Sequence, residues 1–413
     1  MTSKRKIAFL CHPYHRGGVT RWMADAAIAF AQRGWQVTFI TPEPSVRFFS
    51  AGGRETMIEL LGKNHGAAVN IISKRAGREF ELGTAAYREY IYGTMLAKLE
   101  PGTPLVLSDD LSVWKAAISM YKTYPIVGVL HADEEFYYRL AEQYYDKVAV
   151  MACVSGRVSR TACKRVPGMR PDIVYTIPCG IELPPVSPEY NGADKLRLVY
   201  VGRVSEFQKR VTDLLLISEQ LQKKGVAFSL DIIGDGVDRV SLEHKVIDAG
   251  LEGIITFHGW QSQQVVSEKL SQSDILLLTS DFEGTPIAMM EALAAGCGIV
   301  GTRVSGIEDY GAHAEAASCY RLYEVGDIDA AVAGILSLVE VPRNERRSAA
   351  GKLAMSEFTM DICLDRYIAA IDKIVASDAP VPAVKMSLKD IAYSRIIAIA
   401  RTVKLLASGS KAQ

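Results

Sequence analysis

The feature that most constrains the fold is a repeated alternation of short apolar runs with helical segments. The first two runs, at 6–11 and 35–41, flank a helical segment at 20–34 that ends at Gly34. Further apolar runs follow at 104–109, 125–131 and 147–155. Glycine is common just past a helix, and strands covered by helices on both faces have continuous apolar runs. The pattern therefore predicts a parallel α/β sheet.

A second series of the same kind begins near residue 196. Its apolar runs lie at 196–204, 228–236, 254–260, 274–280 and 298–302. The stretch LPPVSPEYNGADK between the two series is rich in proline, glycine and polar residues, which is typical of a linker. We expect two doubly wound, Rossmann-like domains facing each other across a cleft, with ligands at the carboxyl ends of their strands.

Composition excludes several classes of protein. The 47 Lys and Arg residues balance 47 Asp and Glu residues, whereas a general nucleic-acid binder would be basic. The N-terminal apolar run is too short for a signal peptide, and no segment is long enough to span a membrane. The seven cysteines form no C-x-x-C pair, and neither they nor the histidines show metal-ligand spacing. We expect a cytoplasmic protein with no metal and no cofactor.

An apolar helix predicted at 286–295 contains one acidic residue, Glu291, and Glu283 precedes it by eight residues. A carboxylate among apolar side chains is costly unless something satisfies its charge. We predict Thr285 as the N-cap, Pro286 as the first helical residue and Gly296 at the end. Free amides at such a helix start attract an anion such as phosphate. We expect the two glutamates to bracket a phosphate and to bind hydroxyls of a ribose or a sugar.

Basic residues that suit a diphosphate follow the first strand of the second series. Arg203 offers a fixed fork of donors and Lys209 a mobile point charge, while Gly202 leaves room beside Arg203. A glycine-flanked turn, Gly234 to Gly236, follows the next strand and allows a close approach of the backbone to a ligand.

Together these segments resemble the retaining GT-B glycosyltransferases of family 4, the group 1 glycosyl transferases. EGTPIAMME has the spacing of the family's two glutamates, VGRVSEFQKR resembles its diphosphate segment, and IIGDG resembles its glycine turn. FHGW is similar to its Phe-x-Gly strand end, RGGV to its N-terminal glycine loop, and IPCGIE to the segment entering its linker. The resemblance covers roughly residues 6–375.

The resemblance implies roles for individual residues. Glu283 would orient the transferred sugar, Glu291 would bind the ribose hydroxyls, and Arg203 and Lys209 would balance the leaving diphosphate. His131, which ends a predicted strand, would lie near the sugar and the acceptor; the alternative is a loop histidine. The other substrate-binding candidates are Gly17, Gly18, Gly202, Gly234, Gly236, Gly259, Trp260, Gly284, Thr285, Pro286 and Ile287. Trp260 would stack on the base, or else belong to the core or surface.

The family's architecture and chemistry give further expectations. An N-terminal acceptor-side domain is expected at 1–185, a linker at 186–195 and a nucleotide-sugar-binding domain at 196–360, followed by a helix at 361–380 that crosses back to the first domain. The expected reaction is a metal-independent transfer of a sugar from a UDP- or GDP-linked donor to a saccharide or lipid-linked acceptor. It would retain the anomeric configuration and serve surface polysaccharide or glycolipid assembly.

The sequence departs from the family pattern at three places. Gly298 stands where proline is usual, Thr285-Pro286 where an aromatic residue and a glycine are common, and Cys179 where asparagine is frequent. The middle one changes the pocket for diphosphate and sugar, so it affects the identity of the donor. Alternatives on the same fold are a nucleotide-sugar 2-epimerase and a phosphorylase, which would need a pyridoxal lysine. A non-catalytic nucleotide-binding partner subunit is the alternative from another class.

The C-terminal segment, 381–413, has the pattern of a basic amphipathic helix. Apolar residues recur at helical spacing, and basic residues are interleaved with them. Two interpretations remain open. The helix docks on its own protein, or residues 385–406 contact the inner face of the cytoplasmic membrane through anionic lipid.

Overall fold

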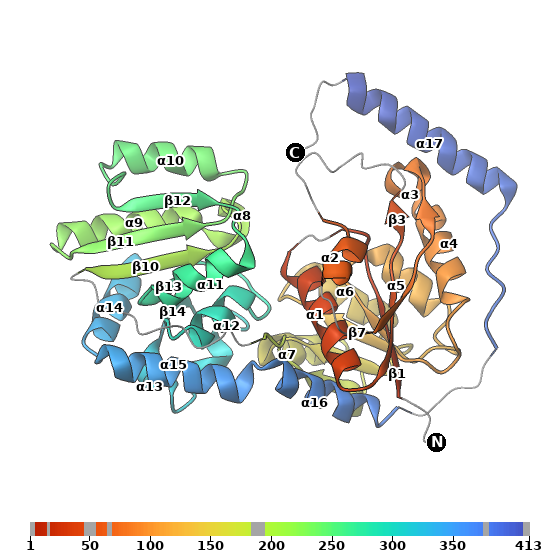
Figure 1. Ribbon diagram of the computed structural model, residues 1–413, viewed down its shortest axis with the longest axis horizontal. Coiled ribbons are helices and arrows are strands. Elements are labelled where there is room, and N and C mark those ends of the chain that lie inside the picture. The colour runs from red at the N-terminus through yellow and green to blue at the C-terminus, as the bar shows by residue number, and fades with distance from the viewer. Residues whose placement is uncertain are drawn as a thin grey trace.

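The computed structural model describes residues 5–14, 17–44, 55–63, 68–182, 195–374 and 380–407. These residues form two α/β domains that lie side by side, here called the N-domain and the C-domain (Figure 1). The predicted linker at 186–195 falls almost wholly outside the described residues.

The N-domain is built on a seven-stranded sheet whose neighbouring strands are all parallel. Across the sheet the strands are β4 (Val69–Ile72), β2 (Gln36–Ile40), β1 (Lys6–Leu10), β6 (Leu105–Leu107), β7 (Ile126–Leu130), β8 (Val150–Cys153) and β9 (Val174–Thr176). Its helices are α1 (Gly18–Gln32), α2 (Met57–Lys63), α3 (Arg78–Leu82), α4 (Ala85–Leu96), α5 (Leu111–Ile118), α6 (Glu135–Tyr144) and α7 (Gly156–Arg165). Two very short strands, β3 (Glu43–Pro44) and β5 (Arg75–Ala76), pair outside the sheet.

The C-domain has a six-stranded parallel sheet. Its strands are β12 (Ile255–Gly259), β11 (Phe228–Ile233), β10 (Leu196–Val201), β13 (Ile275–Leu278), β14 (Gly298–Thr302) and β15 (Tyr320–Tyr323). Its helices are α8 (Glu206–Lys209), α9 (Val211–Lys223), α10 (Arg239–Asp248), α11 (Gln263–Ser271), α12 (Ile287–Ala294), α13 (Ala316–Cys319), α14 (Ile328–Val339) and α15 (Arg343–Glu357). The expectation of two doubly wound domains is confirmed.

Both sheets reverse their strand order next to their first strand. In the N-domain β1 lies between β2 and β6, and in the C-domain β10 lies between β11 and β13. A crevice forms at such a switch point, beyond the carboxyl ends of the strands, and ligands of doubly wound folds bind there. The strand order therefore places the expected ligand site of each domain beyond the carboxyl end of its first strand.

Three edge strands, β4, β9 and β15, have no counterpart among the predicted runs. Each is only half buried, so its sequence lacks the continuous apolar run by which the central strands were found. The central strands are shorter than predicted, because the apolar runs extend into the loops at the carboxyl edge.

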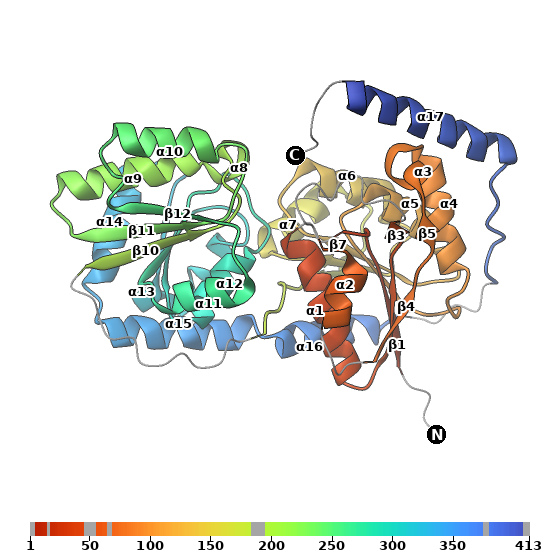
Figure 2. The same cartoon turned by 45° about the horizontal axis from the view of Figure 1, so that its top comes forward.

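Helix α16 (Met360–Ile371) packs against α1 of the N-domain after the chain leaves α15 of the C-domain (Figures 1 and 2). Ile181 and the segment at 358–360 exchange two backbone hydrogen bonds, from the amide of Ile181 to the carbonyl of Phe358 and from the amide of Met360 to the carbonyl of Ile181. Arg33, the C-cap of α1, pairs with Asp361 and Asp365 of α16. The last helix, α17 (Leu388–Ala407), lies against α3 at the far side of the N-domain.

Candidate active site

The predicted donor-site residues follow the carboxyl ends of neighbouring C-domain strands. Gly202 and Arg203 follow β10, Gly234 and Gly236 follow β11, and Glu283 lies in the loop after β13. Because β11, β10 and β13 are adjacent, parallel packing brings these loops to one edge of the sheet. This edge faces the N-domain, since the loop after β13 makes direct contacts with residues 131–154.

Glu283 is buried and held by two donors of its own domain. Its Oε1 accepts hydrogen bonds from Nζ of Lys209 and from the Oγ of Ser280, the latter at 2.6 Å. The two charged side chains are 8% and 18% exposed, so this ion pair is largely withdrawn from water. The lysine therefore fixes the position of the carboxylate.

The loop after β7 of the N-domain completes the surroundings of Glu283. The amide of Asp133 donates to the backbone carbonyl of Glu283 at 3.1 Å. Burial, followed by the negative charge of Glu283, raises the pKa of Glu134, while Arg203 acts in the opposite direction. The structure thus brings Glu283, Lys209 and Arg203 together and adds Glu134, which the sequence did not single out. The side chain of Arg203 is exposed.

His131 is buried directly beside this loop. Its ring lies edge-on to Trp22 at 5.5 Å and to Tyr137 at 6.1 Å. Its Nε2 has no hydrogen-bond partner among the described residues, and burial lowers the pKa of His131 to about 3. The imidazole is therefore neutral near pH 7. A Cβ on Gly284 would lie 1.9 Å from the carbonyl oxygen of His131, so the two loops are in close contact.

The start of α12 differs from the prediction by one residue. Pro286, with φ −65° and ψ 121°, is the N-cap, and the helix begins at Ile287. Thr285 is not the cap, because its hydroxyl donates to the carbonyl of Val154 in the N-domain at 2.5 Å. Sequence propensity favoured a local cap, whereas a contact between the domains uses the same hydroxyl.

Glu291 lies one helical turn after the first residue of α12. Burial raises the pKa of its carboxyl group, and the side-chain amide of Gln263 donates a hydrogen bond that opposes the shift. Arg21 of α1 also acts on this carboxyl group from the N-domain, and Arg21 is itself paired with Asp25 at 2.7 Å. Gln263 and Arg21 therefore offset part of the cost of burying a lone carboxylate in an apolar helix.

The glycines of the C-domain serve contacts between loops. A Cβ on Gly234 would lie 1.9 Å from the carbonyl oxygen of Gly202, and one on Gly236 would lie 2.1 Å from that of Val204. The amide of Gly234 donates to the carbonyl of Gly259, whose φ is 65°. These glycines thus allow backbone segments to approach each other closely, and the contacts fix the position of the loop that carries Arg203.

The three remaining predicted residues lie on opposite sides of the domain boundary. Gly17 is the N-cap of α1 with φ 135°, and a Cβ on Gly18 would lie 3.0 Å from Cδ1 of Ile287 in α12. Trp260 is 72% exposed at the end of β12, three residues before Gln263.

Sequence reasoning missed several residues at this site: Arg21, Asp25, Glu134, Gln263 and Ser280. Arg21 lies next to the glycine loop RGGV, and Ser280 lies three residues before Glu283, so proximity to recognised motifs could have indicated both. Gln263 carries no such signal, because only the fold brings it to Glu291.

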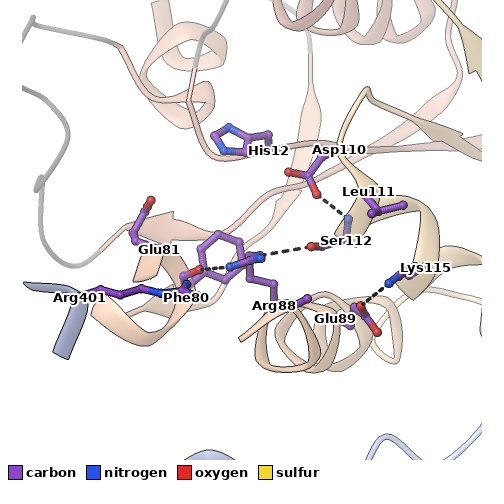
Figure 3. Close-up of a pocket in the computed structure, with 11 residues that line it drawn as sticks. His12, Phe80, Glu81, Arg88, Glu89, Asp110, Leu111, Ser112, Lys115 and Arg401 are labelled. Atoms are coloured by element: carbon purple, nitrogen blue, oxygen red, sulfur yellow. Dashed lines mark hydrogen bonds and ion pairs between the residues drawn. The ribbon is translucent and has the colours of Figure 1, made fainter. Parts of the chain in front are cut away.

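A separate pocket lies in the N-domain (Figure 3). It has a volume of about 410 Å³, and its polar lining includes His12 after β1, Asp110 after β6, Arg88 and Lys115. Arg401 of α17 also lines it. Since β1 and β6 are the strands at which the sheet order reverses, this pocket occupies the switch point of the N-domain. None of the predicted donor-site residues lines it.

Within the described residues, no group of three or more His, Cys, Asp or Glu side chains could hold a metal ion.

Comparison with known proteins assigns a family to one part of the chain. Residues 188–354 match the family described as "Glycosyl transferases group 1". The matched segment holds Arg203, Lys209, Glu283 and Glu291, so the resemblance is confirmed for the C-domain. A stretch of 101 residues is 41% identical to the lipopolysaccharide 1,6-galactosyltransferase of Salmonella typhimurium, covering 24% of this chain and 27% of that protein. The match thus spans about a quarter of that curated relative.

Solved structures extend the likeness in fold to nearly the whole chain. A mutant of TarM from S. aureus, crystallised with UDP, fondaparinux and α-GlcNAc-glycerol, gives a TM-score of 0.71 at 12% identity, with 89% of this chain and 100% of that chain covered. HepE from Anabaena, in complex with UDP and glucose, gives 0.66 at 16% identity and covers 90% and 100%. At these identities the likeness shows the fold, which is GT-B.

Proposed function

We propose that the chain is a retaining, metal-independent glycosyltransferase that moves a sugar from a nucleoside diphosphate donor to a hydroxyl group. The observation that carries the proposal is the convergence of Glu283, Lys209 and Arg203 on one sheet edge, inside the segment that matches the family model. The charges of these side chains indicate which part of the donor each of them would bind. Two cationic side chains suit a departing diphosphate, and a buried carboxylate suits the hydroxyls of the sugar.

The donor is proposed to lie along the start of α12. Its diphosphate would meet Arg203 and the amides near Ile287, its sugar would meet Glu283, and its ribose would meet Glu291. Trp260 is well placed for the base, since Gln263, three residues later, contacts Glu291. The UDP in the two related structures supports a uridine donor, with GDP as the second candidate.

In the transfer, the bond between the anomeric carbon and the donor phosphate breaks. The bond between the anomeric carbon and the acceptor oxygen forms on the same face of the ring. The nucleoside diphosphate leaves with the electron pair of the broken bond, and the proton of the acceptor hydroxyl passes to an oxygen of that leaving group. His131 would serve as a neutral hydrogen-bonding group near the sugar, because burial lowers its pKa to about 3. Contacts such as that between Thr285 and Val154 would exclude water from the cleft.

The acceptor is proposed to bind in the pocket at the switch point of the N-domain. Its lining carries carboxylate, guanidinium and ammonium groups together, a mixture that suits a polyhydroxylated saccharide with or without charged groups. We propose a growing surface polysaccharide or lipid-linked glycan as the acceptor, and the cytoplasm as the compartment. The cysteines at 11, 153, 163, 179, 297, 319 and 363 are free thiols, which suit a reducing compartment.

The first test is thermal denaturation with UDP, GDP, ADP and NAD in turn. A ligand at 100 times its dissociation constant stabilises the folded state by roughly 2.7 kcal/mol. A shift of the melting temperature with UDP or GDP, and none with NAD, is expected. A shift with NAD alone, or none with either UDP or GDP, would contradict the proposal.

The same measurement tests Glu291. The Glu291→Gln variant keeps the shape of the side chain and removes its charge, so the shift caused by the nucleoside diphosphate should shrink. Glu268→Gln is the matched control, because Glu268 is an exposed acid of α11. An unchanged shift in Glu291→Gln would show that this residue does not bind the nucleotide.

A further inference from the structure

Helix α17 contacts the rest of the protein through its small and polar side chains. Ser394, Ala398 and Thr402 are buried and recur every four residues, so they form one face of the helix. The Oγ of Ser394 accepts a hydrogen bond from the amide of Thr84 at 3.1 Å. Nη1 of Arg401 donates to the carbonyls of Leu82 and Gly83 at 2.9 and 3.1 Å. These contacts fix the rotation of α17 about its axis.

The large apolar side chains of α17 lie on the other side, in solvent. Leu388 is 83% exposed, Ile396 62%, Ile399 60% and Val403 59%. With Ala392, which is also exposed, they are spaced by three or four residues and form one continuous stripe. The stripe that the sequence predicted therefore does not dock on the N-domain. Scattered exposed apolar residues are ordinary, but a contiguous apolar stripe indicates an interaction surface.

The charges around this stripe are almost all positive. Lys385, Lys389, Arg395 and Lys404 are exposed on or next to α17, although Arg395 pairs with Glu79 of α3 at 3.2 Å. Asp390 is the acidic residue among 385–404. No described helix, α17 included, is long and apolar enough to cross a membrane. An apolar stripe flanked by cations suits a helix that lies in the interface of an anionic bilayer, with the long basic side chains reaching the headgroups.

We propose that the exposed face of α17, formed by Leu388, Ala392, Ile396, Ile399 and Val403, binds the surface of an anionic lipid bilayer. A second copy of this chain fits the face less well, because two basic faces would repel each other. The docked face of α17 holds the N-domain in a fixed orientation on the bilayer. Arg401, on α17, lines the switch-point pocket, so the pocket lies beside the proposed lipid contact.

The test is flotation of the full chain with two kinds of vesicle, one of phosphatidylcholine alone and one containing phosphatidylglycerol. Binding is expected to the anionic vesicles and is expected to weaken as salt is raised. The double variant Ile396→Glu, Ile399→Glu should lower partitioning by about tenfold or more, since it places two carboxylates in the contact. Both positions are largely exposed, so the fold should tolerate them.

The matched control is Val240→Glu, a change at a 63% exposed position of α10. It should leave vesicle binding unchanged. The proposal is overturned if the wild-type chain does not bind anionic vesicles, or if the double variant binds them as well as the control does. It is equally overturned if the double variant instead abolishes self-association in sedimentation velocity, which would make the face a dimer contact.

This inference can fail independently of the glycosyltransferase proposal. Nucleotide-dependent thermal stabilisation should be the same in the wild-type chain and in Ile396→Glu, Ile399→Glu. Loss of vesicle binding with an unchanged nucleotide response therefore concerns α17 alone.

Discussion

At the scale of single residues, the site depends on a carboxylate whose charge is matched inside its own domain. Glu283 is tied to Lys209 and Ser280, and the two charged side chains of the pair are mostly buried. In such a setting the attraction is offset by the desolvation of both groups, but removal of one partner leaves a buried charge unpaired. Lys209 therefore has a structural role in addition to the electrostatic one proposed for it.

The first residue-scale prediction concerns this pair. Lys209→Met should destabilise the protein by about 3 kcal/mol, because it leaves Glu283 without its cation. Lys209→Met combined with Glu283→Gln should recover part of that loss, giving a coupling energy on the order of 1–3 kcal/mol. Urea denaturation of the wild type, Lys209→Met, Glu283→Gln and the double variant measures both quantities.

The control is an exposed ion pair of the same domain. Arg303 and Glu324 pair at 2.8 Å with side chains 48% and 71% exposed. Arg303→Met should cost no more than about 1 kcal/mol. Equal losses in Lys209→Met and Arg303→Met would show that the pairing of Glu283 contributes nothing to stability.

At the scale of elements, the loop between β13 and α12 joins the two domains. Its backbone packs so tightly that a Cβ on Gly284 would meet the carbonyl oxygen of His131, and a Cβ on Gly306 would lie 1.4 Å from the carbonyl oxygen of Gly284. This close contact between backbones requires glycine at both positions, and Gly306 also has a positive φ of 73°. The loop thus holds His131 and Glu283 in place through contacts between backbones.

The element-scale prediction is that Gly284→Ala destabilises the protein by about 1–3 kcal/mol, as overpacking does when the neighbour is backbone and cannot move aside. Gly351→Ala is the control, because Gly351 lies in α15 and a Cβ there would meet nothing within 4 Å. That change should be neutral or stabilising by up to about 1 kcal/mol, since alanine favours helix. Thermal denaturation of both variants measures their stability relative to the wild type. A Gly284→Ala variant as stable as the wild type would mean that the loops separate easily.

At the scale of the whole molecule, the domains meet through a second set of polar contacts at the start of α7. Arg157 pairs with Glu308 through two hydrogen bonds of 2.7 and 2.6 Å. The amide of Gly156 donates to Asp309 at 2.7 Å, and the hydroxyls of Ser155 and Ser305 lie 2.6 Å apart. A boundary built from polar and charged contacts is suited to opening and closing around substrates.

The molecule-scale prediction uses charge reversal at this boundary. Arg157→Glu faces Glu308 with a like charge, so hydrogen exchange in segment 154–160 should become faster than in the wild type. The swap Arg157→Glu with Glu308→Arg should restore slow exchange, because it restores the opposite charges. Equal exchange in all three proteins would exclude a role for this pair in holding the domains together.

Local sequence is enough to predict the two parallel sheets, because the central strands of such sheets are buried on both faces and have continuous apolar runs. It also determined that Glu283 and Glu291 lie near the start of one helix, since helical spacing is local. The tertiary structure alone decided that Lys209 pairs with Glu283, that Arg21 acts on Glu291, and that Thr285 binds Val154 in place of capping α12. It likewise decided that the small-residue face of α17, not its apolar stripe, docks on α3. The physical reason is the same in each case. Periodicity and propensity act over a few neighbouring residues, whereas these contacts join segments far apart in the chain and depend on how two domains and a terminal helix pack.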